Sequence, residues 1–400
     1  MFLTRSPMLA VRDGRLFLFA QALDALAIGV SQVALPWLVL ENGGTQAEAG
    51  LIFPVSVIPY VVFGLIAGSI GDRFPRRTVM LCGHLEQTVF AAVIPIWTLA
   101  GAPPVGVVLG AAFAVGTGRV FVDAAAFGAV ASIVGTERFV EGQSALSAAW
   151  SIGFFGGPLL GGALVAAVGP GFALAGEAAA VALAALMIAA IRTTFERAPE
   201  QPVGSASIRE GVRFMVHNRG IATYTVIAVA FNFVGAGSFA LLVPLLRDGV
   251  GLGSGAVGTI LTLGSLAFLA ASVLASGVTR RFGGAVVMAG CLLVTPVAIA
   301  LLGVVGALVT ALVAVLFYEF NEGLISVVAI GERQRRAPER LQARVGIAGR
   351  MILLGAMASG GAIASALTGK VGISHLYLAM GAATMVVGVL ACPFLLRLHD

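Results

Sequence analysis

Two acidic residues, Glu319 and Glu322, stand three positions apart in a long apolar stretch of the chain. On a helix, residues three apart share one face and are separated by about 4.5 Å along the axis. Two carboxylates this close in a poorly solvated place cannot both ionise readily, so one of them tends to keep its proton. We interpret the pair as a site that takes up and releases protons. The alternative is that Glu322 pairs with Arg119 or Arg350 and is structural.

Three further charged residues, Asp24, Arg119 and Asp123, also lie within apolar stretches. A charge at the centre of a membrane span costs about 2.5–3.5 kcal/mol or more, so such residues are either functional or paired. Arg119 and Asp123 are one helical turn apart, and an internal ion pair is as good an interpretation as a role in ion coupling. We predict that proton coupling or cavity lining involves Asp24, Arg119, Asp123, Glu319 and Glu322.

The elements that must position these charges are membrane spans. Hydrophobic residues make up 59% of the 400 residues and charged residues 11%, whereas a soluble domain carries about 25% charged residues. A bilayer crossing needs roughly 20 apolar residues, and twelve stretches qualify. The predicted fold class is therefore an all-α membrane protein, and eleven or thirteen spans stay open because two connectors are very short. The predicted spans are 16–40, 50–70, 78–100, 105–134, 144–168, 171–191, 221–246, 254–278, 284–304, 306–330, 345–369 and 373–396.

The arginines predict how these spans are oriented, because positive residues accumulate in cytoplasmic segments. With the N-terminus inside, the outer loops hold only Arg247 and Lys370, and the other arginines outside the spans are cytoplasmic. The sequence predicts a multi-pass protein of a bacterial cytoplasmic membrane with both termini in the cytoplasm. Single cysteines within spans, and the lack of any nucleotide-binding or hydrolase motif, predict no metal site, no cofactor and no enzyme.

The longest polar stretch, residues 192–220, divides the chain into predicted domains of residues 1–191 and 221–400, each with six spans. Pro199 to Gly204 is predicted to be a flexible break, and Ser207-Ile-Arg-Glu210 a capping box that starts an interfacial helix. The halves also repeat weakly, since Asp72-Arg73-Phe74 matches Arg280-Arg281-Phe282. We predict two pseudo-symmetric six-helix bundles, which is a common design of secondary transporters.

The loop between the second and third predicted spans carries the most specific pattern. One apolar helix ends in Gly-Asp-Arg-x-x-Arg-Arg, and the next begins at once. This pattern resembles the corresponding loop of the major facilitator superfamily, roughly Gly-x-Leu-Ala-Asp-Arg-x-Gly-Arg-Lys, with Pro75 where that family usually has Gly. The matching positions are Gly68, Gly71, Asp72, Arg73, Arg76 and Arg77. The resemblance implies a conformational gate made of Asp72, Arg73, Arg76 and Arg77, with Glu137 and Glu141 as candidate partners.

A second pattern lies in the fifth predicted span, where small residues recur every four positions. Such spacing lets two helix backbones touch. The run also resembles the helix-five signature of antiporters in the same superfamily, and on that basis it favours export over import. The matching residues are Gly153, Gly157, Pro158, Gly161 and Gly162.

In this superfamily the first, fourth, seventh and tenth helices line a central cavity. The resemblance therefore implies that the five charged residues predicted for coupling surround the path of the substrate. An Asp in helix one and an Arg in helix four recur in its drug–proton antiporters, and Asp24 and Arg119 fall there. Glu86 and Glu177 lie on the third and sixth helices, which are peripheral in this fold, and are expected to be structural.

We therefore expect a secondary transporter that exports an amphipathic small molecule, such as an antibiotic or a secondary metabolite, by proton antiport. The resemblance is to the branch with macrolide efflux pumps and the enterobactin exporter. A siderophore exporter, sodium coupling, and a non-transporting sensor or scaffold on the same fold are the alternatives. The expected partners are the small molecule, protons and membrane lipid, with no nucleic acid, and the protein is expected to be a monomer.

Overall fold

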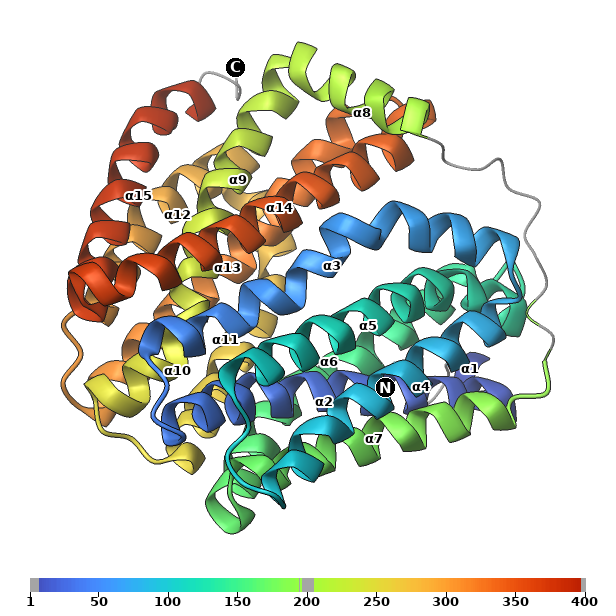
Figure 1. Ribbon diagram of the computed structural model, residues 1–400. Helices are drawn as coiled ribbons and strands as arrows, with labels where there is room; N and C mark the ends of the chain where they lie inside the picture. Colours follow the sequence, from blue (N-terminus) through green and yellow to red (C-terminus); the bar gives the residue numbers. More distant parts are fainter. Residues whose placement is uncertain (1–6, 194, 196–204, 397–400) are drawn as a thin grey trace. The chain divides into compact units, whose positions relative to one another are not determined.

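The computed structural model describes residues 7–193, 195 and 205–396, and the regular structure within them is entirely helical (Figure 1). Twelve of the described helices are long and apolar enough to cross a membrane. They coincide with the twelve predicted stretches, so the all-α membrane fold is confirmed. The flexible break predicted from Pro199 to Gly204 lies outside the described residues.

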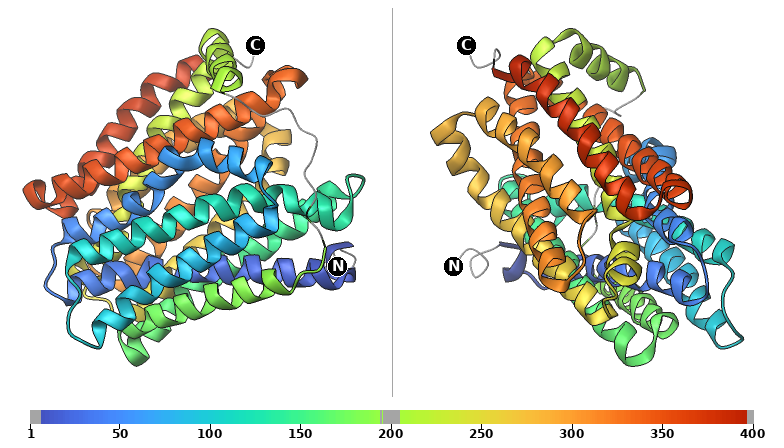
Figure 2. Two further views of the ribbon diagram at one scale, coloured as in Figure 1. Left: turned by 45° about the vertical axis from the view of Figure 1, so that its right-hand side comes forward. Right: turned by 90° about the vertical axis from the view of Figure 1, so that its left-hand side faces the viewer.

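The chain divides into two compact units, and unit 1 comprises Met1–Gly44, Val55–Pro202 and Ser254–Thr259. Its central helix is α2, which packs along both α6 and α7, while α4 packs against α5 and α7. Figure 2 shows α7, in light green, running along the dark blue α2. The helices are α1 (Pro7–Ala10), α2 (Arg12–Glu41), α3 (Gln46–Arg73), α4 (Arg76–Thr98), α5 (Val105–Val134), α6 (Phe139–Val168) and α7 (Pro170–Ala190).

Unit 2 comprises Thr45–Pro54, Val203–Gly253 and Ile260–Asp400, so it includes the first turns of α3 and most of α11. Helix α14 packs along α9, and α12 packs along α15. A π-helical turn at Leu245–Gly249 follows α10. The helices are α8 (Ser205–His217), α9 (Arg219–Ala240), α10 (Leu242–Pro244), α11 (Ser254–Phe282), α12 (Gly284–Leu302), α13 (Leu308–Arg336), α14 (Glu339–Val371) and α15 (Ile373–Leu396).

Helix α8 covers the segment in which an interfacial helix is predicted. It packs against α14, and Gly211 lies so close that a Cβ there would be 2.7 Å from the carbonyl oxygen of Arg344. Met215 of α8 is buried together with Leu341 and Val345 of α14. The placement of α8 at a membrane surface stays a prediction.

Glycines in the left-handed region separate the spans that have the shortest connectors. Gly169 ends α6 and Gly372 ends α14, both with φ of 83°, which only glycine adopts without strain. Both halves of the chain use a Val-Gly pair, Val168-Gly169 and Val371-Gly372, to end one span just before the next begins. Among the described residues the candidate spans number twelve, and neither eleven nor thirteen.

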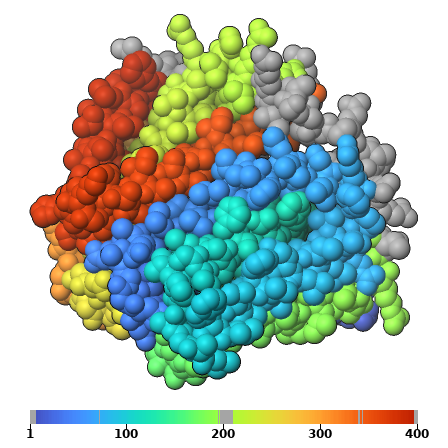
Figure 3. Space-filling model, viewed as in Figure 1, coloured from blue at the N-terminus to red at the C-terminus, as the bar shows by residue number. Residues whose placement is uncertain are grey.

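The outward surface of unit 1 is apolar, as lipid contact requires. Helices α3, α4 and α5 contribute to the face seen in Figure 3. On α4 the exposed side chains include Leu85, Val89 and Ile96, whereas His84 and Gln87 of the same helix are buried. This distribution is the reverse of that in a water-soluble bundle, in which polar groups face outward and apolar groups inward.

Candidate functional site

Asp24 occupies the centre of a buried charge cluster in unit 1. One of its carboxylate oxygens is 3.7 Å from Nδ1 of His84, and the other is 4.0 Å from Nε of Arg119. These residues come from α2, α4 and α5, and the side chains of Asp24 and His84 are almost completely buried. A carboxylate at this depth is tolerable only with a compensating charge nearby, and Arg119 supplies it. Two of the residues predicted for coupling, Asp24 and Arg119, are thus brought together.

Asp123 has a partner on a different helix. The phenol of Tyr60 on α3 donates a hydrogen bond of 2.6 Å to a carboxylate oxygen of Asp123 on α5. Sequence reasoning missed Tyr60, although a tyrosine within an otherwise apolar span is a signal, because its hydroxyl needs a polar partner once it is buried. Together, Arg119 and Tyr60 extend the polar interior of unit 1 from α2 across α5 to α3.

Several buried polar atoms around this cluster have no hydrogen-bond partner among the described residues. They include both ring nitrogens of His84, both side-chain polar atoms of Gln87, and Nε and Nη2 of Arg119. Unpaired buried polar atoms are uncommon in proteins, and each costs about 1–3 kcal/mol. Their concentration in one place marks a polar region within an apolar bundle, where function is the usual reason for the cost.

In unit 2 the paired acids of α13 contact two different helices. Glu319 packs against α11, where a Cβ on Gly264 would lie 3.1 Å from its side chain. Glu322 lies beside α9, where a Cβ on Gly235 would be 3.6 Å from its Oε1. That oxygen is buried and has no hydrogen-bond partner among the described residues. Glycine at 264 leaves room for the Cγ of Glu319, and glycine at 235 leaves room for the hydroxyl of Tyr318, which a Cβ would meet at 2.8 Å. The coupling role of the pair stays a prediction.

Two arginines of the predicted gate bind backbone carbonyls within unit 1, Arg76 in the body of α5 and Arg77 at the end of α7. Arg76 donates a hydrogen bond of 2.8 Å to the carbonyl of Gly128 on α5, and Arg77 donates to the carbonyls of Ile188 and Ala189 on α7. Cations near a helix C-terminus satisfy its last carbonyls and its negative dipole end. Arg73 is exposed. The gating role of Asp72 stays a prediction, because its side chain lies outside the described part of the structure.

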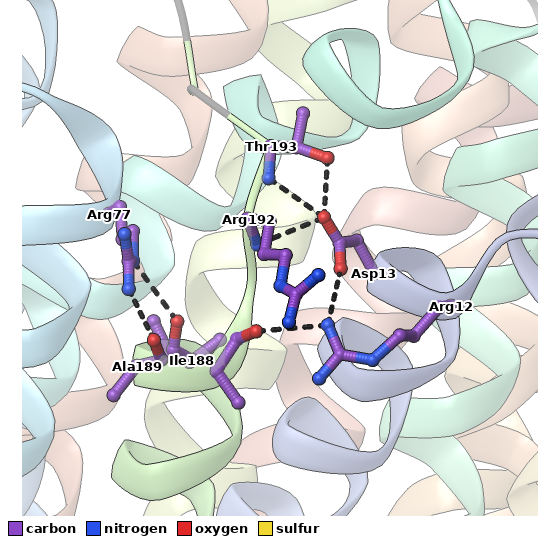
Figure 4. A network of polar contacts seen from close by, with 8 residues as sticks. Arg12, Asp13, Arg77, Ile188, Ala189, Arg192 and Thr193 are labelled. Carbon is purple, nitrogen blue, oxygen red and sulfur yellow. Dashed lines mark hydrogen bonds and ion pairs between the residues drawn. The ribbon is translucent and has the colours of Figure 1, made fainter.

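The end of α7 carries a second set of polar contacts that the sequence did not reveal (Figure 4). Asp13 of α2 accepts hydrogen bonds from the backbone amides of Arg192 and Thr193 and from the Thr193 hydroxyl, at 3.0, 2.7 and 2.7 Å. Arg12 donates to the carbonyl of Ala190. Together with Arg77, these groups fix the point at which the chain leaves α7.

Asp13→Ala is expected to lower the free energy of unfolding by about 1–3 kcal/mol, because it removes three part-buried hydrogen bonds to a charged carboxylate. Thermal denaturation of the purified protein in detergent measures the effect. Arg12→Ala is the control, since its side chain is 53% exposed and its ion pair with Asp13 is a surface pair worth ~0–1 kcal/mol. Equal melting temperatures for both variants would contradict the role given to Asp13.

The glycines of the helix-five motif are the positions at which α6 crosses α2. A Cβ would lie 2.0 Å from the carbonyl oxygen of Ala22 if placed on Gly153, and 2.5 Å from Cα of Gly29 if placed on Gly157. On Gly161 it would lie 2.8 Å from Cα of Val30. No side chain fits between these backbones. The ring of Pro158 also contacts this crossing, since a Cβ on Gly29 would meet its Cδ at 2.7 Å.

In each unit a pair of adjacent glycines lets one helix pack closely against two different helices. In unit 1, Gly162 faces the first turns of α11, with a would-be Cβ 3.0 Å from Cα of Gly258. In unit 2, Gly360 of α14 crosses α9 at the carbonyl of Phe233, and Gly361 faces Pro54 in the first turns of α3. The pairs Gly161-Gly162 and Gly360-Gly361 are therefore structural counterparts.

No group of three His, Cys, Asp or Glu side chains within the described ranges could hold a metal ion. The charged groups of this site are instead carboxylates, an arginine and a histidine in unit 1, and the two carboxyl groups of Glu319 and Glu322 in unit 2. The sequence pattern of the Major Facilitator Superfamily matches residues 17–345, which is most of the chain. The chain belongs to the Major Facilitator Superfamily. As a member of this family it is a transporter and not an enzyme.

Two relatives in this superfamily carry the same description, multidrug efflux pump Tap. The protein from Mycolicibacterium fortuitum is 27% identical over 402 residues, covering 96% of each chain. The one from Mycobacterium tuberculosis is 30% identical over 227 residues, covering 52% of each chain. Both come from bacteria, in keeping with a multi-pass bacterial membrane protein.

Solved structures of other transporters share the fold. The nucleoside transporter NupG aligns with a TM-score of 0.77 at 11% identity, covering 96% of this chain and 98% of NupG. A bacterial homolog of the human lysosomal transporter Spinster aligns with a TM-score of 0.75 at 13% identity, covering 96% of both chains. At these identities the likeness concerns the fold alone.

Proposed function

We propose that the protein exports an amphipathic small molecule from a bacterial cell in exchange for protons. The observation that carries this proposal is the contact between Asp24 and Arg119 in the interior of unit 1. An ionised carboxylate holds the arginine, whereas a protonated one releases it, so proton binding can select between two arrangements of the helices. The drug-efflux direction is supported by the descriptions of the Tap relatives.

The remaining charged residues receive roles that follow from this scheme. Glu319 and Glu322 are proposed to bind protons in unit 2, and Asp123 to tune Arg119 from the same helix. Two bundles of residues 1–191 and 221–400, joined by residues 192–220, are proposed to rock about a central cavity with both termini in the cytoplasm. Asp72 with Arg73, Arg76 and Arg77 is proposed to hold one conformation of the first bundle.

Export is expected to run on the proton gradient. In everted membrane vesicles energised by respiration, uptake of a fluorescent amphipathic drug should collapse with a protonophore and survive vanadate, because the family carries its substrates without hydrolysing ATP. Vesicles that contain the Asp24→Asn variant serve as the background control. Transport that vanadate stops and a protonophore spares would refute proton coupling, and a strict requirement for sodium would reassign the ion.

A further inference from the structure

A small, partly open cavity of ≈ 30 Å³ in unit 1 is lined by residues of α2, α3, α4, α5 and α7. This is room for about two water molecules. Most of its lining is apolar, and the polar groups are the side chains of Ser31, Ser56, Arg119 and Glu177. It therefore lies between Arg119, which contacts Asp24, and Glu177 on α7, which is expected from its peripheral helix to be structural.

Glu177 is an acid without a direct counterion. The residue is 4% exposed and lies within a membrane-spanning helix. Among the described residues, no cationic group comes within ion-pair distance of its carboxyl group. An isolated carboxylate is expensive to bury, whereas a protonated or water-bridged one is much less so. The cavity next to Glu177 has room for water that can bridge an ionised carboxylate or exchange a proton with it.

Ser31 can satisfy Glu177 in both protonation states. Its hydroxyl donates a hydrogen bond of 2.9 Å to the carbonyl of Ala27 and is also a hydrogen-bonding partner of the Glu177 carboxyl group. A hydroxyl has one proton and can accept as well as donate. With Glu177 protonated, the acid donates to Ser31 and Ser31 donates to Ala27. With Glu177 ionised, the Ser31 hydroxyl turns and donates to the carboxylate.

The charges around this cavity do not balance if every acid is ionised. Arg119 contacts Asp24 and lines the cavity together with Glu177, and its Nε and Nη2 have no hydrogen-bond partner in the described structure. Three helices pack against α7. Besides Asp24, α2 has Arg12, Asp13 and Arg15 in its first turn and Glu41 at its end. Helix α4 has His84, Glu86 and Cys82, with Arg76 and Arg77 in its first turn, and α6 has Glu141 in its first turn. One arginine cannot compensate both Asp24 and Glu177, so ionisation of one of these acids favours the protonated form of the other.

We propose that Glu177 is a second proton-carrying residue of unit 1, which exchanges a proton with Asp24 through water in the cavity, while Arg119 stays protonated and compensates the acid that is ionised. In the exchange, Asp24 gains one proton and releases Arg119, and Glu177 loses one proton and receives the arginine's charge across the cavity. The total charge of the cluster is unchanged. Glu177 is thereby a coupling residue, one that acts on transport by holding and releasing a proton. The inference rests on the proposed proton antiport.

The test compares Glu177→Gln with Glu86→Gln, a matched replacement on α4 that does not line the cavity. Glu177→Gln is expected to lower uphill export by on the order of tenfold or more. It should also remove one protonated-carboxyl band from the infrared difference spectrum between alkaline and acidic pH. Glu86→Gln should keep both the export and the band, and Glu177→Asp should restore part of the export. If Glu177→Gln is folded and both its export and its spectrum match the wild type, the proposal is wrong.

Ser31→Ala keeps the acid and supplies an independent variant should Glu177→Gln not fold. Loss of the hydroxyl is expected to shift the pH at which the carboxyl band titrates, and the pH profile of export should move in the same direction. An unchanged titration and an unchanged profile would overturn the proposal. The failure of proton antiport itself has a different signature, because wild-type export would then withstand a protonophore.

Discussion

Replacement of Glu322 by glutamine is expected to abolish uphill export while leaving downhill exchange of the substrate, and Glu319→Gln is expected to do the same. Glutamine keeps the size of the side chain but cannot release a proton, and net export needs that release whereas exchange does not. No ion-pair partner of Glu322 occurs in the described part of the chain, so its neutralisation leaves no opposite charge uncompensated. Thermal stability should therefore stay close to that of the wild type.

Asp24→Asn is the informative comparison for these variants. It should also stop uphill export if Asp24 belongs to the same proton circuit, but it leaves Arg119 buried without its carboxylate. Breaking a buried ion pair by removing one partner costs about 3–5 kcal/mol, so this variant should melt at a clearly lower temperature. Exchange, uphill export and melting are measured side by side on each purified variant in proteoliposomes or detergent. If both glutamine variants pump at the wild-type rate, the acids of α13 are structural.

Gly157→Ala is expected to destabilise unit 1 severely and to abolish transport. The new Cβ would lie 2.5 Å from Cα of Gly29, and backbone atoms of α2 cannot move aside as a flexible side chain can. Forced overpacking costs about 1–3 kcal/mol and occasionally more. Gly156→Ala is a closely matched control, because its Cβ would be 4.0 Å from the nearest atom, a methyl group of Leu26.

Both substitutions remove one glycine from the same helix and gain the same helix propensity, about 1 kcal/mol. Any difference in stability between the two variants is therefore caused by the close packing of α6 against α2 and not by the helix propensity of the residue. The amount of folded protein recovered from membranes and its melting temperature measure that difference. Equal values for the two variants would show that α2 and α6 are further apart in the membrane than in this structure.

The fold was predictable to a large extent because lipid imposes a simple rule on sequence. Each span must bury its backbone polar groups in a helix and expose apolar side chains, so twelve apolar stretches became twelve helices. The predicted spans differ from the structure where an apolar stretch and a helix do not begin or end at the same residue. Helix α13 continues to Arg336 although its candidate span ends at Arg333, close to the predicted 330, because charged residues can extend a helix beyond the hydrocarbon. The predicted span 221–246 is broken after Ala240, where α10 and the π-helical turn intervene.

The candidate site was predictable only as a set of charged residues. The sequence indicated Asp24, Arg119 and Asp123, but not that His84 and Tyr60 are their neighbours on α4 and α3. The sequence does not fix the rotation of each helix about its axis, because a helix that is apolar around its whole circumference gives no sign of which face points inward. Glu177 illustrates this limit, since the alanine-rich α7 offers the same surface in every direction.

The glycine spacing of α6 reflects the short distance between α6 and α2. It gives little information on the direction in which the substrate is transported. Positions 153, 157 and 161 lack side chains because the backbone of α2 occupies that space, and Gly360 meets α9 under the same constraint in the other unit. An importer whose helices cross at the same separation would need the same spacing. A sequence search with this signature should therefore collect transporters by their interhelical geometry, and importers are expected among its results.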